Sequence, residues 1–169
     1  ITARTLQPVP GVYTYSNIPI YEGSWVTTKF TVDTTDSDQL FIIPNDNVDI
    51  STLSVSIQTS STDTTLTTFT KANNLVEVKN TTNAYFIQET IDAEWEVYFG
   101  DGVVGTALID GNIVILSYVV TNEIDANGAT AFTSATNISG FGDITVVTNT
   151  AAAGGAAGLG DPVAARRPI

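Results

Sequence analysis

The chain has 169 residues and a mass of 17.8 kDa, and 43% of its residues are hydrophobic, which is enough for one sizeable core in a single domain. Its formal net charge of −12, from 18 acidic and 6 basic residues, argues against nucleic-acid binding, because such a surface repels phosphate backbones. The absence of cysteine and histidine excludes disulfide scaffolds, Cys/His zinc sites and histidine-based catalytic triads.

Two further features concern the context of the chain. It contains no methionine, even at position 1, which indicates a processed chain or a piece of a longer protein. No apolar run approaches the ~20 residues that a transmembrane helix needs, and residues 1–5 lack the pattern of a signal peptide. We therefore predict that the chain has no membrane partner.

Patterns typical of β-strands cover most of the chain. Apolar and polar side chains alternate over residues 26–32 and again over residues 53–58, as in half-buried strands. Shorter strand candidates are residues 40–43, 75–78, 84–88 and 144–147. The Ser/Thr-rich residues 59–70 fit either an exposed strand pair or a mobile loop. Together these elements predict an all-β fold, mainly antiparallel and sandwich-like, with little helix.

Two strands near the centre of the sequence supply the predicted core. Apolar and polar residues alternate over residues 94–99, so that the apolar side chains share one face. Residues 113–120 are nearly all apolar, which is typical of a central strand covered on both faces. The predicted core residues are Trp95, Val97, Phe99, Ile113, Ile115, Leu116 and Tyr118.

Glycine-rich turns connect these two strands, and we predict that they reverse the chain in a hairpin. Residues 100–105 match the dinucleotide-binding pattern G-x-G-x-x-G, but another turn signal at residues 110–112 leaves no room for the helix that must receive the pyrophosphate. Asp101 would also place a carboxylate where phosphates approach. The predicted structural turn residues are Gly100, Asp101, Gly102, Gly105 and Gly111.

Acidic residues suggest a calcium site or a glycosidase acid/base pair, but the residues that either site requires are not all present. The loops at residues 33–38 and 46–49 offer oxygen ligands for calcium, but the glycine and terminal glutamate of an EF-hand are absent, and Asx turns explain both loops. The pairs Glu94/Glu96 and Asp33/Asp36 could act as acid and base in a glycosidase, although an outward strand face is more simply solvated. We predict no catalytic residue, metal, cofactor or small-molecule substrate, and hence no enzyme.

The clearest boundary in the sequence is an Ala/Gly-rich linker at residues 151–160. Asp161 and Pro162 follow it and are typical of the N-cap and first position of a helix. We therefore predict a β-rich domain at residues 1–150, the linker at residues 151–160 and the truncated start of a helical segment at residues 161–169.

The glycine turns and the strand behind them carry a family resemblance. Residues 98–105, 110–118 and 126–129, with the Phe-Gly-Asp-Gly turn as their most specific part, resemble the core of the baseplate J-like family. Residues 21–44 resemble more narrowly the large baseplate wedge subunit of contractile-tailed bacteriophages, or myophages. The resemblance implies a structural protein of the virion tail baseplate that is assembled in the host cytoplasm. The implied partners are other wedge subunits and a second copy, as a homodimer of the full-length protein.

A second interpretation remains open at this point. A secreted or surface β-sandwich that binds carbohydrate or calcium, as adhesin modules do, would also have acidic loops and a threonine-rich stretch. The truncated helix start at Asp161 does not fit this alternative.

Overall fold

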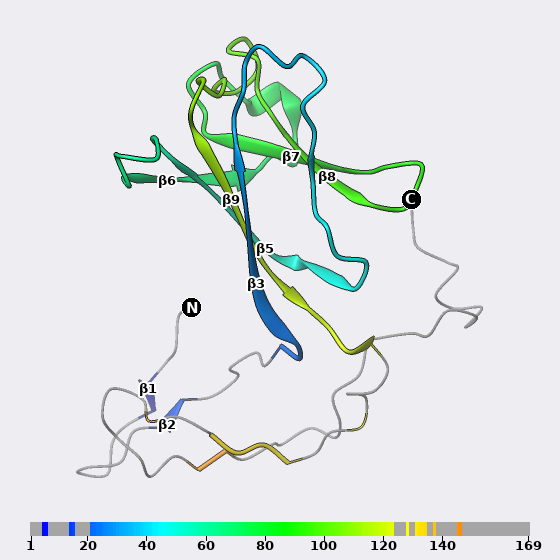
Figure 1. Ribbon diagram of the computed structural model, residues 1–169. Helices are drawn as coiled ribbons and strands as arrows, with labels where there is room; N and C mark the ends of the chain where they lie inside the picture. The colour runs from blue at the N-terminus through cyan, green and yellow to red at the C-terminus, as the bar shows by residue number, and fades with distance from the viewer. Residues whose placement is uncertain are drawn as a thin grey trace.

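The computed structural model describes residues 21–123 continuously, together with residues 5, 6, 14, 15, 128, 131–134, 137, 145 and 146. Residues 21–123 contain a seven-stranded sheet with the order β3-β9-β5-β6-β7-β8-β4 (Figure 1). Its strands are β3 (Ser24–Thr31), β4 (Phe41–Ile42), β5 (Val48–Gln58), β6 (Leu66–Lys71), β7 (Ala84–Glu89), β8 (Trp95–Phe99) and β9 (Ile113–Val120). A separate antiparallel pair joins β1 (Thr5–Leu6) and β2 (Thr14–Tyr15).

This architecture confirms the predicted all-β, mainly antiparallel class. Every neighbouring pair in the large sheet is antiparallel except β6 and β7, which run parallel. Within the described residues, the helical element is a single 3₁₀ turn, η1 (Leu75–Glu77). The predicted linker and C-terminal helix start lie outside the described residues, as do most residues of the strand expected at 144–147.

The sheet folds over on itself, and β6 passes from one half to the other. The first four residues of β6 pair with the end of β5, and its last two residues, Thr70 and Lys71, pair with the start of β7. One half therefore contains β3, β9 and β5, and the other contains β7, β8 and β4. Figure 1 shows β7 and β8 running across the direction of β3 and β9. The two halves enclose the core.

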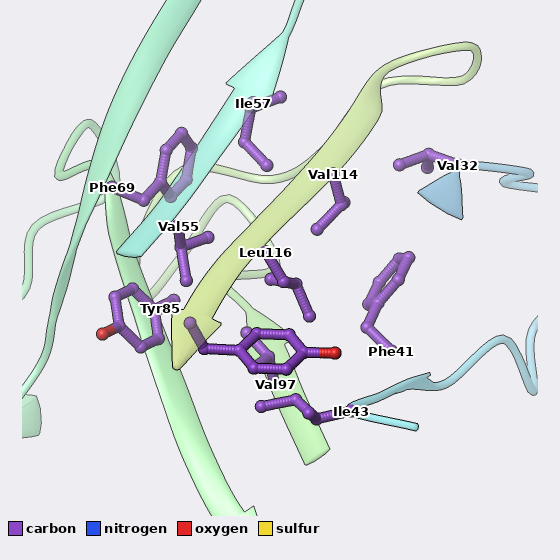
Figure 2. Packing of buried hydrophobic residues seen from close by; sticks show 11 residues of the cluster. Val32, Phe41, Ile43, Val55, Ile57, Phe69, Tyr85, Val97, Val114 and Leu116 are labelled. Atoms are coloured by element: carbon purple, nitrogen blue, oxygen red, sulfur yellow. The ribbon is translucent and has the colours of Figure 1, made fainter. Parts of the chain in front are cut away.

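Buried apolar side chains from both halves form one cluster. Figure 2 shows Val114 and Leu116 of β9 and Val55 of β5 packed together with Val97 of β8. The cluster consists of Val32, Phe41, Ile43, Val55, Ile57, Phe69, Tyr85, Val97, Val114, Leu116 and Tyr118. Burial of this apolar surface is the main favourable contribution to folding, at about 25 cal/mol per Å².

Four phenylalanine rings connect strands from the two halves. Phe41 makes edge-to-face contacts with Phe30 and Phe99, with ring centroids 5.7 and 5.6 Å apart. Phe99 also meets Phe69 edge to face at 5.6 Å. Because such pairs contribute roughly 0.5–1.5 kcal/mol beyond their buried area, they hold β3, β4, β8 and β6 against one another.

The predicted hairpin between residues 95–99 and 113–120 is wrong. Strand β8 pairs with β7 and β4, whereas β9 pairs with β3 and β5, so the two strands belong to opposite halves of the sheet. The glycine-rich residues 100–112 cross between the halves. Turn residues such as glycine reveal that the chain reverses locally, but they do not select the strand with which each arm pairs.

The predicted core of β9 also needs correction. Val114, Leu116 and Tyr118 are fully buried, whereas Ile113 and Ile115 are half-buried on the opposite face and are not members of the cluster. Side chains alternate between the faces of a strand, and only one face of β9 meets the other half of the sheet. The expectation that both faces are covered is therefore replaced by one packed face and one face on which Ile113 and Ile115 are half-covered and Val119 is buried.

Two local expectations differ from the structure or are resolved by it. Residues 75–77 form η1 rather than a strand, because the Asn74 side chain accepts a hydrogen bond from the Val76 N–H and caps the turn. Of the Ser/Thr-rich residues 59–70, residues 66–70 belong to β6, while Ser60 and Asp63 organise the preceding turn.

The sequence predicted that the outward face of β8, which carries Glu96, is exposed to solvent. In the structure this face is partly covered. Glu96 is buried, and the side-chain amide of Gln88 donates a hydrogen bond of 2.7 Å to its Oε2. Next to it Tyr98 stacks on Phe86, with ring centroids 5.2 Å apart. Since β8 lies between β7 and β4, side chains from neighbouring strands cover one another on this face.

Candidate functional site

The glycine loop at residues 100–105 is closed by a direct approach of its two ends. A Cβ atom at Gly100 would lie 2.3 Å from the Val104 carbonyl oxygen and 2.5 Å from the Gly105 carbonyl carbon. Gly102 and Gly105 both have φ values of 86°, in the left-handed region that favours glycine. The Gly102 N–H donates to the Gly105 carbonyl oxygen at 3.1 Å. The loop can close in this way because Gly100, Gly102 and Gly105 have no side chain.

The exposed carboxylate of Asp101 caps this loop. Its Oδ1 accepts hydrogen bonds of 2.9 Å from the backbone N–H groups of Val103 and Val104. The N–H groups of Val104 and Val103 hold the pKa of Asp101 below its ordinary value, because they stabilise the ionised carboxylate. The same N–H groups would have to bind phosphate in a nucleotide loop, and Asp101 already occupies them. The carboxylate is structural.

The end of the glycine loop is tied to the segment between η1 and β7. The Gly105 N–H donates to the Lys79 carbonyl oxygen at 3.2 Å, and the Thr106 N–H donates to the Thr82 carbonyl oxygen at 2.9 Å. The Thr106 hydroxyl also donates to the side-chain oxygen of Asn83 at 3.0 Å. These bonds bring η1 and the glycine loop to the same end of the domain.

That end carries large apolar side chains that face solvent. Leu75 and Val76 of η1 are 64% and 92% exposed, and Val103 of the glycine loop is 74% exposed. Single exposed apolar residues are ordinary on a protein surface, whereas several at one end of a domain are typical of a protein contact. We refer to Leu75, Val76 and Val103 as the apolar end.

Gly111 forms a second turn, between the crossover and β9. Its φ is 79°, and nothing lies within 4 Å of the position that a Cβ would occupy. The Gly111 N–H donates to the Val32 carbonyl oxygen at 2.9 Å, and the Asn112 side chain donates to the Thr59 carbonyl oxygen at 2.9 Å. This turn thus joins the ends of β3 and β5 to the start of β9.

The structure places the predicted core residues in three groups. Val97, Leu116 and Tyr118 lie in the cluster, Trp95 and Phe99 pack against it, and Ile113 and Ile115 lie on the other face of β9. Five of these seven side chains therefore contribute to the packing of the core.

An open cavity of about 260 Å³ lies between the loop after β3 and strand β8. Phe41 contributes to its apolar lining, and Asp33, Asp36 and Glu96 supply carboxylates. The hydroxyl and N–H of Thr35 hold the pKa of Asp33 below its ordinary value because they stabilise the ionised carboxylate, whereas the proton donor of a glycosidase needs a raised pKa.

The acidic loops are capped by their own residues. Asp36 accepts from the Asp38 N–H at 3.0 Å, and Asp49 accepts from the N–H and hydroxyl of Ser51 at 3.0 and 2.6 Å. Among the described residues, no group of three acidic side chains converges on a point where a metal ion could bind. The geometry thus gives no support to the calcium-binding adhesin alternative. Within the same residues, no helix has the length and apolarity needed to cross a bilayer.

A polar contact inside the core was not predicted from the sequence. The hydroxyl of the fully buried Tyr118 donates to the side-chain oxygen of Asn45 at 2.6 Å and lies 2.9 Å from the Thr28 hydroxyl. It links β3 and β9 to the segment after β4. The signal was a tyrosine in a mostly aliphatic strand, since a buried phenol requires a hydrogen-bond partner.

A second unpredicted contact lies at a register change. Strand β5 shifts its pairing with β9 between Asp49 and Ser54. The Thr52 hydroxyl accepts from the Val119 N–H at 2.9 Å and donates to the Asp49 carbonyl oxygen at 2.6 Å. It replaces the strand partner that the bulge removes.

Comparison with known proteins matches this folded region. A family model for the third domain of the bacteriophage baseplate wedge protein gp6 matches residues 27–121, from within β3 to the end of β9. The baseplate wedge protein gp6 of Enterobacteria phage T4 is 30% identical over 88 residues, which cover 43% of this chain and 13% of the T4 protein. The chain thus corresponds to a small part of that relative. Because the family model covers more than half of it, the chain belongs to the family of the third domain of the bacteriophage baseplate wedge protein gp6.

Proposed function

We propose that the chain is a structural domain of a baseplate wedge subunit in a contractile-tailed bacteriophage and acts through protein–protein contacts. The observation that carries this proposal is the family match, whose limits coincide with the seven-stranded sheet. The T4 relative is itself described as a baseplate wedge protein. The same proposal places the chain in the tail baseplate of the virion.

The geometry supports a structural rather than an enzymatic role. Asp101, the acidic residue of the most specific motif, is used to close its own loop, and Asp33 is held ionised by Thr35. Loops that are closed by their own side chains give the domain a defined surface for neighbouring subunits to contact. The apolar end offers a surface on which such a neighbour can dock.

We propose other wedge subunits and a second copy of the protein as the partners. The resemblance of residues 98–105, 110–118 and 126–129 to the baseplate J-like family points to the same kind of assembly, with the Phe-Gly-Asp-Gly turn as a shared structural device. In that proposal the turn fixes the loop shape, and the side chains beside it, such as Val103, make contacts with other wedge subunits.

Localisation on particles tests the proposed function. Antibodies raised against residues 1–169 are gold-labelled and applied to tailed particles and to cells of the host. Label at the distal end of contractile tails is expected, and it should disappear when the antibody is first absorbed with the purified chain. Label on cell surfaces, with none on particles, would refute the baseplate assignment.

A further inference from the structure

Strand β3 is an edge of the sheet, and half of its backbone groups point away from the fold. It pairs with β9 on one side only. The Val32 N–H donates to Asn112 of the β9 side at 2.8 Å, so by the alternation of an antiparallel ladder Val26, Thr28 and Phe30 also face β9. The N–H and C=O groups of residues 25, 27 and 29 face outward.

Only one end of this outer edge is covered within residues 21–123. The side-chain amide of Gln39 donates to the Thr31 carbonyl oxygen at 2.8 Å and accepts from the Asp33 N–H at 3.0 Å, as a neighbouring strand would. Strand β4, at the opposite edge of the sheet, has only two residues, and Pro44 follows soon after it. Proteins protect sheet edges with such short strands, prolines and caps. In the described part of the chain, residues 25–29 of β3 have no cap.

The exposed side chains of β3 are self-complementary when two copies of the strand are related by a two-fold axis. Trp25 is 68% exposed, and Thr27 and Lys29 are also exposed on the same face. An antiparallel pair centred on Thr27 places Trp25 opposite Lys29 of the second copy and Lys29 opposite Trp25 of the second copy. Directly opposed side chains have Cβ atoms about 4.5–5.5 Å apart, within the reach of a cation–π contact.

The charge distribution favours this edge over other surfaces for contact between identical chains. Residues 21–123 carry fifteen carboxylates and three lysines, so two copies repel each other over most of their surfaces. Residues 23–32 contain no carboxylate and one of the three lysines, Lys29. The edge therefore has backbone N–H and C=O groups that are open to a partner strand, and it lacks the carboxylates that make the rest of the surface negative.

We propose that β3 pairs antiparallel with β3 of a second copy, centred on Thr27, and extends the sheet across two protomers. This inference rests on the proposed function, for which it names the surface of self-association. Each of the opposed pairs, Thr27 with Thr27 and Trp25 with Lys29, exchanges two backbone N–H···O bonds. The interface is isologous, so the contact closes as a dimer and does not propagate.

A proline at the two-fold centre tests the backbone contact. Thr27→Pro removes an N–H that the fold itself does not use, and an edge strand tolerates proline at such a position. Sedimentation velocity of residues 1–169 over a range of concentrations should show a dimer for the unchanged chain. The Thr27→Pro variant should be a monomer with an unchanged circular dichroism spectrum.

A residue exchange tests the side-chain contact and does not rely on proline. Trp25→Lys places two lysines opposite each other and should weaken dimerisation at least tenfold. The double variant Trp25→Lys/Lys29→Trp restores the opposed pair with the same composition and should recover the dimer. Ile91→Lys, in the turn between β7 and β8, is the matched control, because it changes an exposed apolar residue away from the edge and should leave the dimer intact.

Two outcomes would overturn the inference. A monomeric unchanged chain at all concentrations would show that β3 does not pair with itself. A folded Thr27→Pro variant that still dimerises would assign self-association to another surface. Both outcomes leave the baseplate assignment intact, since the gold-labelling experiment decides that independently.

Discussion

Substitution of Gly100 by alanine should destabilise the domain strongly, and for a steric reason alone. The added Cβ would lie 2.3 Å from the Val104 carbonyl oxygen and 2.6 Å from the Gly105 Cα atom, distances that real Cβ atoms do not show. The neighbouring atoms are backbone, so no side chain can rotate away. The loop must open, and three hydrogen bonds inside it are then lost: the one from the Gly102 N–H and the two accepted by Asp101.

The steric clash sets the expected magnitude. Overpacking against neighbouring atoms costs about 1–3 kcal/mol, and Gly100→Ala should reach the upper end of that range because every close atom is backbone. For a folded region of about 100 residues, a loss of about 3 kcal/mol corresponds to a fall in Tm of about 12–24 °C. Gly111→Ala is the matched control, since its Cβ would meet nothing within 4 Å and only its φ of 79° is unfavourable. That change should cost about 1–2 kcal/mol.

Urea unfolding followed by circular dichroism and tryptophan fluorescence measures both variants. The expected order of stability is unchanged chain, then Gly111→Ala, then Gly100→Ala. A Gly100→Ala variant that loses less than the Gly111→Ala control would refute the reasoning, because it would mean that the two ends of the loop do not approach each other as described.

Three further predictions concern the core and the loop carboxylate. Tyr118→Phe removes the hydroxyl that donates to the half-buried Asn45 and should cost about 0.5–1.5 kcal/mol in urea unfolding, the net contribution of one hydrogen bond; an unchanged midpoint would contradict this contact. Leu116→Ala should cost about 2–5 kcal/mol, while Ile115→Ala on the half-covered face should cost clearly less, and equal losses would refute the assignment of faces in β9. The folded-state pKa of Asp101 lies below its ordinary value of 3.8, so its contribution to stability is present above that value and is lost as the pH falls through the folded pKa. Asp101→Asn should therefore lose less stability than the unchanged chain when thermal melts are compared between pH 5 and pH 2, and parallel losses would show that the carboxylate is not held by its loop.

The short-range features of this protein were determined by the sequence itself. Alternation over residues 26–32 and 95–99 predicted strands β3 and β8, because the two-residue period of a strand is local. The role of Asp101 was predictable for the same reason, since its partners are the N–H groups of residues 103 and 104. A glycine at position 111 was predicted as a turn, and its φ is positive.

Strand pairing and the choice of the buried face were decided only by the tertiary structure. The nearly continuous apolar run of β9 contains no period from which Val114 could be distinguished from Ile115, and the face that met the other half of the sheet became the core. The glycine-rich residues 100–112 suit a hairpin and a crossover equally well in their local chemistry. Contacts between residues far apart in the chain, such as Phe41 with Phe99, decide between the two. The strand pairing that buries the most apolar surface in the common core is the most stable.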